Sequence, residues 1–170
     1  MKKIILLIGI LLTINSCSEK NKTELTPLEQ LPEATQTGKN TFGCLINGKA
    51  FVVKNTSKQT AIYQQGVLQF GATLDINNND ESISFNLINP LENNTEYNFI
   101  EINYKSGYSR KNGNIICIYD FENTYEGNVT FSKIDRANYI ISGTFEFSTN
   151  KGGCEDIKIT NGRFDLKYIP

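Results

Sequence analysis

Short runs of alternating apolar and polar residues fill the chain from Thr41 to Pro170, and clusters of Asn and Gly separate them. A period of two is typical of β-strands, whereas an amphipathic helix repeats its apolar positions every three or four residues. We therefore predict an all-β domain of about nine strands. The predicted strands are 44–53, 60–63, 68–76, 83–87, 97–104, 115–121, 129–134, 140–147 and one or two more within 155–168.

The clearest pattern predicts a hairpin. Residues 68–76 and 83–87 alternate apolar and polar positions, and the turn-forming stretch 77–80 lies between them. Such a pair has one apolar and one polar face, as expected of antiparallel strands that pack on a core and face water on the other side.

The final segment, 155–168, allows two interpretations. Asn161 and Gly162 could form a two-residue turn that pairs Ile159 with Phe164. Alternatively, the segment is a single long strand with a bulge at Gly162, paired with 140–147. Both interpretations are all-β. About nine strands over about 130 residues form one domain with a single hydrophobic core. Closed barrels and two-sheet sandwiches both protect sheet edges, so we expect a single-domain antiparallel β-sandwich or flattened barrel over 41–170.

The first sixteen residues resemble a secretory signal. A basic start is followed by the apolar run 4–14, which is shorter than the ~20 residues that a membrane helix needs. Ile14, Asn15 and Ser16 precede Cys17 in the manner of a lipobox, so we predict cleavage after residue 16 and a diacylglyceryl lipid on Cys17. The alternative is a soluble secreted protein in which Cys17 is an ordinary disulfide partner.

Residues 17–40 form a separate polar stretch. They contain Pro27 and Pro32 and no aromatic residue, a composition that is typical of a flexible tether. The alternative is that Leu28, Leu31 and Ala34 dock on the domain and order half of the linker.

The chain contains no histidine, and this limits the kinds of catalytic and metal site that it can form. It excludes the Ser/His/Asp and Cys/His arrangements and zinc sites with His ligands. Loss of the signal would leave 15 basic and 18 acidic residues, a balance that does not favour nucleic acid as a partner. We predict a protein that is not an enzyme and has no cofactor or metal. A hydrolase with two facing carboxylates, drawn from Asp120, Glu122 and Glu126, is the catalytic alternative.

Three cysteines remain after Cys17, and export favours a disulfide between two of them. The sequence leaves all three pairings open. Cys44 and Cys154 lie near the two ends of the domain, and a bond between them would stabilise it by about 4 to 5 kcal/mol on the chain-entropy model. We take them as the candidate pair. Cys117 lies within an apolar run and is interpreted as a buried free thiol.

Two further patterns could indicate binding. Asp75, Asn77 and Asn79 match the first alternating ligands of a calcium loop, but Asp80 replaces its glycine and Asn86 its glutamate, which favours a plain turn.

Tyrosines could also line a sugar-binding face, because their rings stack and their hydroxyls form hydrogen bonds. Ordinary strand packing selects tyrosine as well. The tyrosines considered are Tyr97, Tyr104, Tyr108, Tyr119 and Tyr125.

The strings LPEATQTGKNTFGCLINGK at 31–49, ISGTFEF at 141–147 and ITNGRFD at 159–165 resemble a family of small Bacteroidetes lipoproteins that is catalogued as a domain of unknown function. Glu33 stands where the family pattern has a second proline. The resemblance implies a lipoprotein of the Gram-negative envelope, and it assigns no activity and no site residue.

The sequence therefore predicts a non-enzymatic, membrane-anchored envelope lipoprotein with a structural or binding domain. Its expected partners are the membrane, through the lipid on Cys17, and an envelope protein or glycan. Ser18 differs from the Asp that retains some lipoproteins at the inner membrane, which favours the outer membrane and leaves the membrane face undecided. A lipocalin-like carrier of a small apolar ligand is the alternative, and an interior filled by Phe70, Phe85, Phe145 and Phe147 would exclude it.

Overall fold

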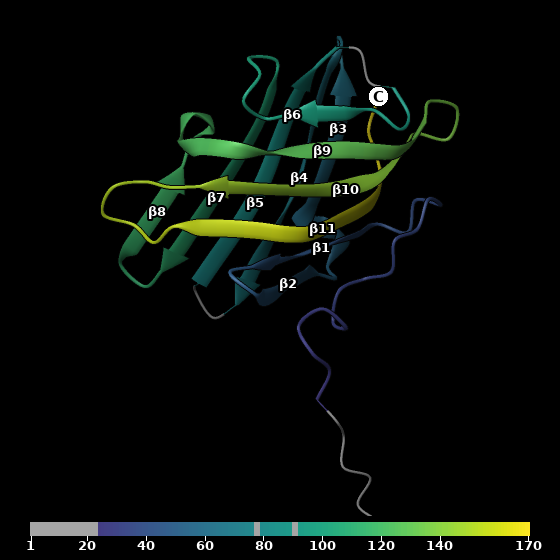
Figure 1. The fold of residues 1–170 in the computed structure, drawn as a ribbon. Helices are drawn as coiled ribbons and strands as arrows, with labels where there is room; N and C mark the ends of the chain where they lie inside the picture. The colour runs from purple at the N-terminus through teal and green to yellow at the C-terminus, as the bar shows by residue number, and fades with distance from the viewer. Residues whose placement is uncertain (1–23, 77–78, 90–91) are drawn as a thin grey trace, which may run out of the picture.

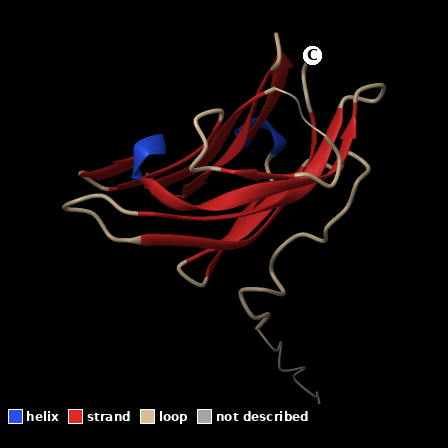
Figure 2. Cartoon of the chain, turned by 45° about the horizontal axis from the view of Figure 1, so that its top comes forward, coloured by secondary structure: helices blue, strands red, loops and turns tan. Residues whose placement is uncertain are grey.

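The computed structural model describes residues 24–76, 79–89 and 92–170. Cys17 and the predicted signal peptide lie outside the described residues. The described residues form eleven strands and two short 3-10 helices, η1 (Thr56–Lys58) and η2 (Phe121–Asn123), which Figure 2 shows in blue. The strands are β1 (Thr41–Ile46), β2 (Lys49–Val53), β3 (Gln59–Gln64), β4 (Val67–Ile76), β5 (Asn79–Ile88), β6 (Glu96–Asn98), β7 (Tyr104–Asn112), β8 (Ile115–Tyr119), β9 (Thr124–Asp135), β10 (Ile140–Thr149) and β11 (Ile157–Lys167).

The strands build two antiparallel sheets that face one another. One has six strands in the order β2-β1-β11-β10-β9-β6, and the other has five in the order β3-β4-β5-β7-β8. Figure 1 shows the strands of one sheet running across those of the other. The prediction of an all-β, sandwich-like domain is confirmed, with eleven strands rather than about nine.

Two differences explain the higher strand count. The predicted strand 44–53 is instead a hairpin, because Asn47 and Gly48 have positive φ angles of 47° and 79° and turn the chain between β1 and β2. Strand β7 was not predicted, because its sequence YKSGYSRKN is mostly polar. Its pairing with β5 and β8 makes it a strand despite this composition.

The strands at the end of the chain follow the bulged interpretation. Strand β11 is continuous and pairs with β10, and it contains an extra residue between the pairs Phe145–Gly162 and Phe147–Ile159. The same extra residue interrupts its pairing with β1. Asn161 has a φ of 53° at this bulge, so Asn161 and Gly162 bend a strand rather than close a hairpin.

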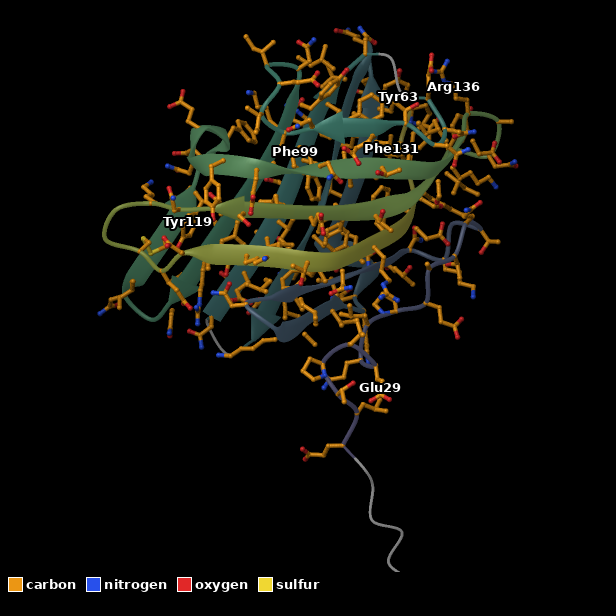
Figure 3. The ribbon with its side chains drawn as sticks, viewed as in Figure 1. Glu29, Tyr63, Phe99, Tyr119, Phe131 and Arg136 are labelled. Carbon is orange, nitrogen blue, oxygen red and sulfur yellow. A yellow bond between two sulfur atoms is a disulfide. The ribbon has the colours of Figure 1, made fainter. Side chains whose placement is uncertain are left out.

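Aromatic rings fill the space between the sheets. The predicted hairpin of β4 and β5 is confirmed, and it places Phe70 opposite Phe85 with ring centroids 4.7 Å apart. Phe85 also contacts Phe145 at 4.9 Å and Phe147 at 5.9 Å. Phe99 and Phe131, labelled in Figure 3, are likewise buried.

The segment before β1 lies against the six-stranded sheet. Leu31 is buried, Leu28 is 48 % exposed, and Arg163 donates a hydrogen bond to the carbonyl oxygen of Pro32 at 3.1 Å. The residues that follow bind the side chain of Asp165. The residues just before the boundary that we predicted at residue 40 thus contact the sheet. Of the three residues in the docking alternative, Leu31 is buried, whereas Leu28 and Ala34 are exposed.

The carboxylate of Asp165 on β11 is fully buried and organises this contact. We call it and its donors the Asp165 hub. Its hydrogen bonds come from Thr35 Oγ1 (2.6 Å), Thr37 N (3.1 Å), Gly38 N (2.8 Å), Lys39 N (3.1 Å) and Ser142 Oγ (2.7 Å). Burial alone would raise the pKa of Asp165, but the hydrogen bonds outweigh it and hold the pKa below its usual value.

Candidate functional site

The cysteines are arranged differently from the prediction. Cys117 and Cys154 form a disulfide, and Cys44 is free and fully buried. The predicted Cys44–Cys154 pair and the free Cys117 are therefore wrong. Cys117 lies on β8 at the edge of one sheet, and the connection between β10 and β11 in the other sheet brings Cys154 to a Cα distance of 6.1 Å. Burial, and then the charge of Glu81, raise the pKa of the Cys44 thiol far above its usual value, so this thiol is unreactive.

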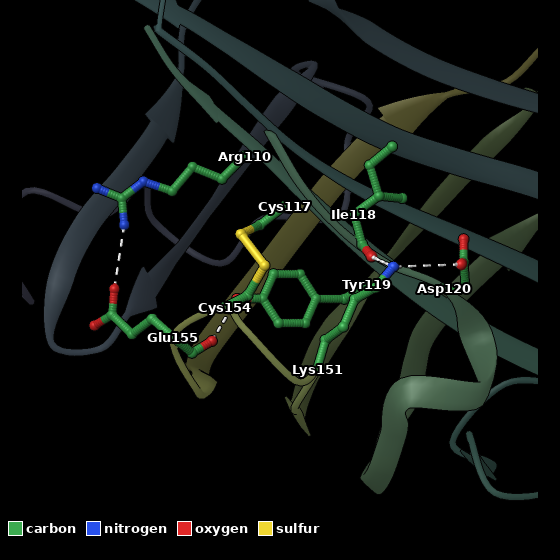
Figure 4. Close-up of a disulfide and its surroundings, with 8 residues drawn as sticks. All are labelled: Arg110, Cys117, Ile118, Tyr119, Asp120, Lys151, Cys154 and Glu155. Carbon is green, nitrogen blue, oxygen red and sulfur yellow. Dashed lines mark hydrogen bonds and ion pairs between the residues drawn. A yellow bond between two sulfur atoms is a disulfide. The ribbon is translucent and has the colours of Figure 1, made fainter. Parts of the chain in front are cut away.

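Polar contacts surround the disulfide, as Figure 4 shows, and we call the whole group the disulfide clasp. Arg110 Nη1 lies 3.3 Å from Glu155 Oε2, and Lys151 Nζ donates to the carbonyl oxygen of Ile118 at 2.6 Å. The hydroxyl of Tyr119 donates to the carbonyl oxygen of Glu155. The clasp therefore joins the edge of the five-stranded sheet to a loop of the six-stranded sheet.

The three candidate catalytic carboxylates lie at the surface, Asp120 and Glu122 around η2 and Glu126 on β9. The side chain of Asp120 is 71 % exposed, and Glu122 lies exposed in the neighbouring turn η2. Glu126 lies on β9 and accepts a hydrogen bond from Ser148 Oγ at 2.7 Å. These positions are typical of solvated surface groups.

The residues with calcium-loop spacing have other partners. Asp75 forms an ion pair with Lys58 at 3.5 Å, and Asn79 Oδ1 accepts a hydrogen bond from Gly113 N at 3.2 Å. Asn77 lies outside the described residues. In the described part of the chain, no group of three or more His, Cys, Asp or Glu side chains is placed to hold a metal ion.

The tyrosines do not form a common sugar-binding face. Tyr97, Tyr108 and Tyr119 are buried in the core, and Tyr125 is 51 % exposed on β9. Tyr108 donates a hydrogen bond to Glu81 at 3.1 Å, and burial raises the pKa of its hydroxyl well above the usual value. Most of these tyrosines are core residues.

A groove of about 390 Å³ lies on the outer face of the five-stranded sheet, and we call it the small-residue groove. Its floor follows from the strand register, since Gly71 on β4 lies opposite Ser84 on β5, and Ser84 lies opposite Gly107 on β7. The small residues on β4 and β5 leave a trough, and Gly107 on β7 is buried beside it and does not line it. Its lining includes Thr60, Gln69, Gly71, Thr73, Ser82, Ser84, Asn86 and Phe121.

Phe121 closes one end of the small-residue groove. A methyl group added to Gly107 would lie 3.5 Å from the Phe121 ring, so the ring lies over the glycine. The ring is 41 % exposed, although an apolar side chain of this size is usually buried. Phe121 belongs to η2, which follows β8 directly, and this connection carries the ring over the outer face.

Charge is sparse in the small-residue groove. Among the described residues of its lining, Lys58 is the one that is ionisable, and it is paired with Asp75. Thr73 and Ser82 share a hydrogen bond of 2.7 Å across β4 and β5, while Gln69 and Asn86 lie opposite one another on the same strands. The surface thus offers uncharged donors and acceptors beside one aromatic ring.

The outer face of the six-stranded sheet has a different character. Two hollows of about 460 Å³ and 540 Å³ share Asn128 and Glu146. Their linings also include Glu126 and Lys158 in one and Glu96 and Arg163 in the other. Two of these charged groups serve the fold, because Arg163 binds the Pro32 carbonyl and Glu126 binds Ser148. We therefore favour the small-residue groove as the candidate site.

Sequence reasoning missed the small-residue groove. The opposition of Gly71 and Ser84 could have been read from the predicted hairpin, because its register follows from the alternation. The position of Phe121 over Gly107 depends on β7, because Gly107 lies on this strand and its polar sequence does not predict a strand.

No family model, curated protein or solved structure matches the chain. The resemblance to small Bacteroidetes lipoproteins therefore stays a prediction. Among the described residues, no helix is long and apolar enough to cross a membrane.

Proposed function

We propose that this chain is a non-enzymatic, lipid-anchored envelope protein that binds a neutral glycan in the small-residue groove. The observation that carries the proposal is the lining, in which small hydroxyl and amide side chains surround a trough and the exposed Phe121 ring closes one end. The membrane attachment rests on the lipobox-like residues before Cys17.

The chemistry of the lining fits an uncharged sugar chain. Sugar hydroxyls both donate and accept hydrogen bonds, and Ser, Thr, Asn and Gln side chains do the same. The apolar face of a sugar ring can pack on the face of Phe121 as other apolar groups pack on aromatic rings. With Lys58 already paired, no unpaired charge in the lining favours an ionic ligand over a neutral one.

The filled interior supports a surface site over the lipocalin-like alternative. A carrier of a small apolar ligand needs a cavity between its strands. Phe70, Phe85, Phe145 and Phe147 are each about 2 % exposed and contact one another there.

The Cys117–Cys154 disulfide supports an exported location, because disulfides persist in oxidising compartments. Metabolic labelling with palmitate tests the anchor. The full-length protein should take up the label and the Cys17→Ser variant should not. Equal labelling of both, or of neither, would contradict lipidation at Cys17.

The glycan site is tested with linear α-glucan, β-glucan and mannan oligosaccharides, titrated into the full-length protein in mild detergent. We expect one class to bind, and Phe121→Ala to weaken its binding about tenfold, which corresponds to about 1.4 kcal/mol. Ser84→Leu should block the floor of the groove and abolish binding.

Ser132→Leu is the matched control, because Ser132 is an exposed serine on β9 of the other sheet. It should leave the affinity unchanged. Binding that survives both Phe121→Ala and Ser84→Leu would refute the small-residue groove as the site.

A further inference from the structure

Strand β8 carries three exposed isoleucines at the edge of the five-stranded sheet. Ile115, Ile116 and Ile118 are 67 %, 61 % and 50 % exposed. Strand β8 pairs with β7 and is the last strand in the order of its sheet. Exposed edge strands offer free backbone groups to another strand, and clustered apolar side chains favour such contacts.

The backbone groups that point outward from this edge belong to Ile116 and Ile118. In an antiparallel pair, the N–H and C=O of one residue point to the same side, and successive residues alternate. The carbonyl oxygen of Ile118 accepts a hydrogen bond from Lys151, which comes from outside the sheet. The carbonyl oxygen of Tyr119 instead lies towards Gly107 on β7. Ile116 and Ile118 therefore face away from β7.

We infer that β8 pairs antiparallel with β8 of a second copy of this chain, about a two-fold axis at Cys117. This register places Ile116 of each copy opposite Ile118 of the other. The outward N–H and C=O groups of both residues then find partners, and the apolar side chains cover one another. The same arrangement sets the β7–β8 turn of one copy, with Lys111 of β7 beside it, close to Asp120 and Glu122 at the end of β8 in the other copy.

The rest of the sheet limits the assembly to two copies. The opposite edge, β3, is covered by the C-terminal residues, because Tyr63 N donates to the carbonyl oxygen of Ile169 at 2.8 Å and Ile169 N donates to that of Ala61 at 2.9 Å. A contact that joins identical edges closes after two copies. Lys151 must release Ile118 when the pair forms, so it weakens the dimer.

The experiment is sedimentation equilibrium of the full-length protein in a density-matched detergent. We expect a reversible monomer–dimer equilibrium. Ile116→Lys and Ile118→Glu should each weaken the dimer at least tenfold, whereas the double variant should restore it, because each Lys then faces a Glu of the other copy. Lys151→Ala should strengthen the dimer several-fold.

The matched control is Ile102→Lys, which makes the same change at an isoleucine that is 83 % exposed outside β8. It should leave the dimer unchanged. A monomer at all concentrations for both the original protein and Lys151→Ala would overturn the inference, as would assemblies larger than two or failure of the double variant to restore pairing. Glycan binding by a monomer would leave the proposed function standing, so the two tests fail independently.

Discussion

The Asp165 hub and the disulfide clasp both fasten a loop to a sheet, and they do so by opposite means. The Asp165 hub is a fully buried carboxylate that holds the segment before β1 through five hydrogen bonds. The disulfide clasp is a covalent bond at a sheet edge, surrounded by partly exposed polar groups. The Asp165 hub depends on the protonation state of Asp165, and the disulfide clasp depends on the redox state of Cys117 and Cys154.

The comparison shows that the position of a loop contact in the fold determines which kind of interaction can stabilise it. A surface ion pair such as Arg110–Glu155 contributes at most about 1 kcal/mol, so the sheet edge gains little without the covalent bond. In the interior, a carboxylate with all its partners in place is stable, but removing it leaves several buried donors unpaired. The two devices should therefore respond to different perturbations.

The largest effect is expected from Asp165→Ala. Loss of the carboxylate leaves buried N–H and hydroxyl donors without an acceptor, so we expect the free energy of unfolding to fall by about 3 to 5 kcal/mol. Urea denaturation measures this change. Asp156→Ala, at an exposed aspartate, is the control and should change stability by less than about 0.5 kcal/mol. A small loss in Asp165→Ala would show that the hub contributes little.

Removal of the disulfide is expected to have the next largest effect. The double variant Cys117→Ser/Cys154→Ser opens a loop with a sequence separation of 37 and should lower the free energy of unfolding by about 2 to 4 kcal/mol. Reductant should destabilise the original protein by a similar amount and leave the double variant unchanged. An equal response of Asp165→Ala and the original protein to reductant would confirm that the two devices are independent.

Ser142→Ala should have a smaller effect within the hub. It removes one of the donors to Asp165, at 2.7 Å, and leaves the others in place. We expect a loss of about 1 to 2 kcal/mol, measured by thermal and urea unfolding. A loss as large as that of Asp165→Ala would mean that Ser142 alone holds the carboxylate.

The smallest effect on stability near neutral pH is expected from protonation of the Asp165 carboxylate. Because the folded-state pKa of Asp165 is lowered, its contribution is fully present above the unfolded value of about 3.9 and is lost as pH falls through the folded pKa. The stability difference between the original protein and Asp165→Ala should stay constant from pH 7 to about pH 5 and shrink at lower pH. The difference for the disulfide variant should not follow this profile. A constant difference for Asp165→Ala down to about pH 2 would contradict the role of the charge.

Much of the fold follows from local pattern, and the candidate site follows from it only in part. Alternation located the hairpin of β4 and β5, and hence the faces of Phe70, Phe85, Gly71 and Ser84. It could not show β7, because polar residues become a strand there only when β5 and β8 supply partners on both sides. The part of the small-residue groove on β4 and β5 therefore follows from the sequence pattern. The position of Phe121 at its end does not.

The sequence by itself determined that this chain is all-β, where most strands lie and which faces they bury, because a period of two is a local property of the backbone. Tertiary structure decided that Cys117 rather than Cys44 pairs with Cys154, that β11 bulges at Asn161 instead of turning, and that Asp165 binds the segment before β1. Each of these depends on which strands become neighbours. Strand order brings together residues that are far apart in sequence, and the local alternation of apolar and polar residues does not specify this order.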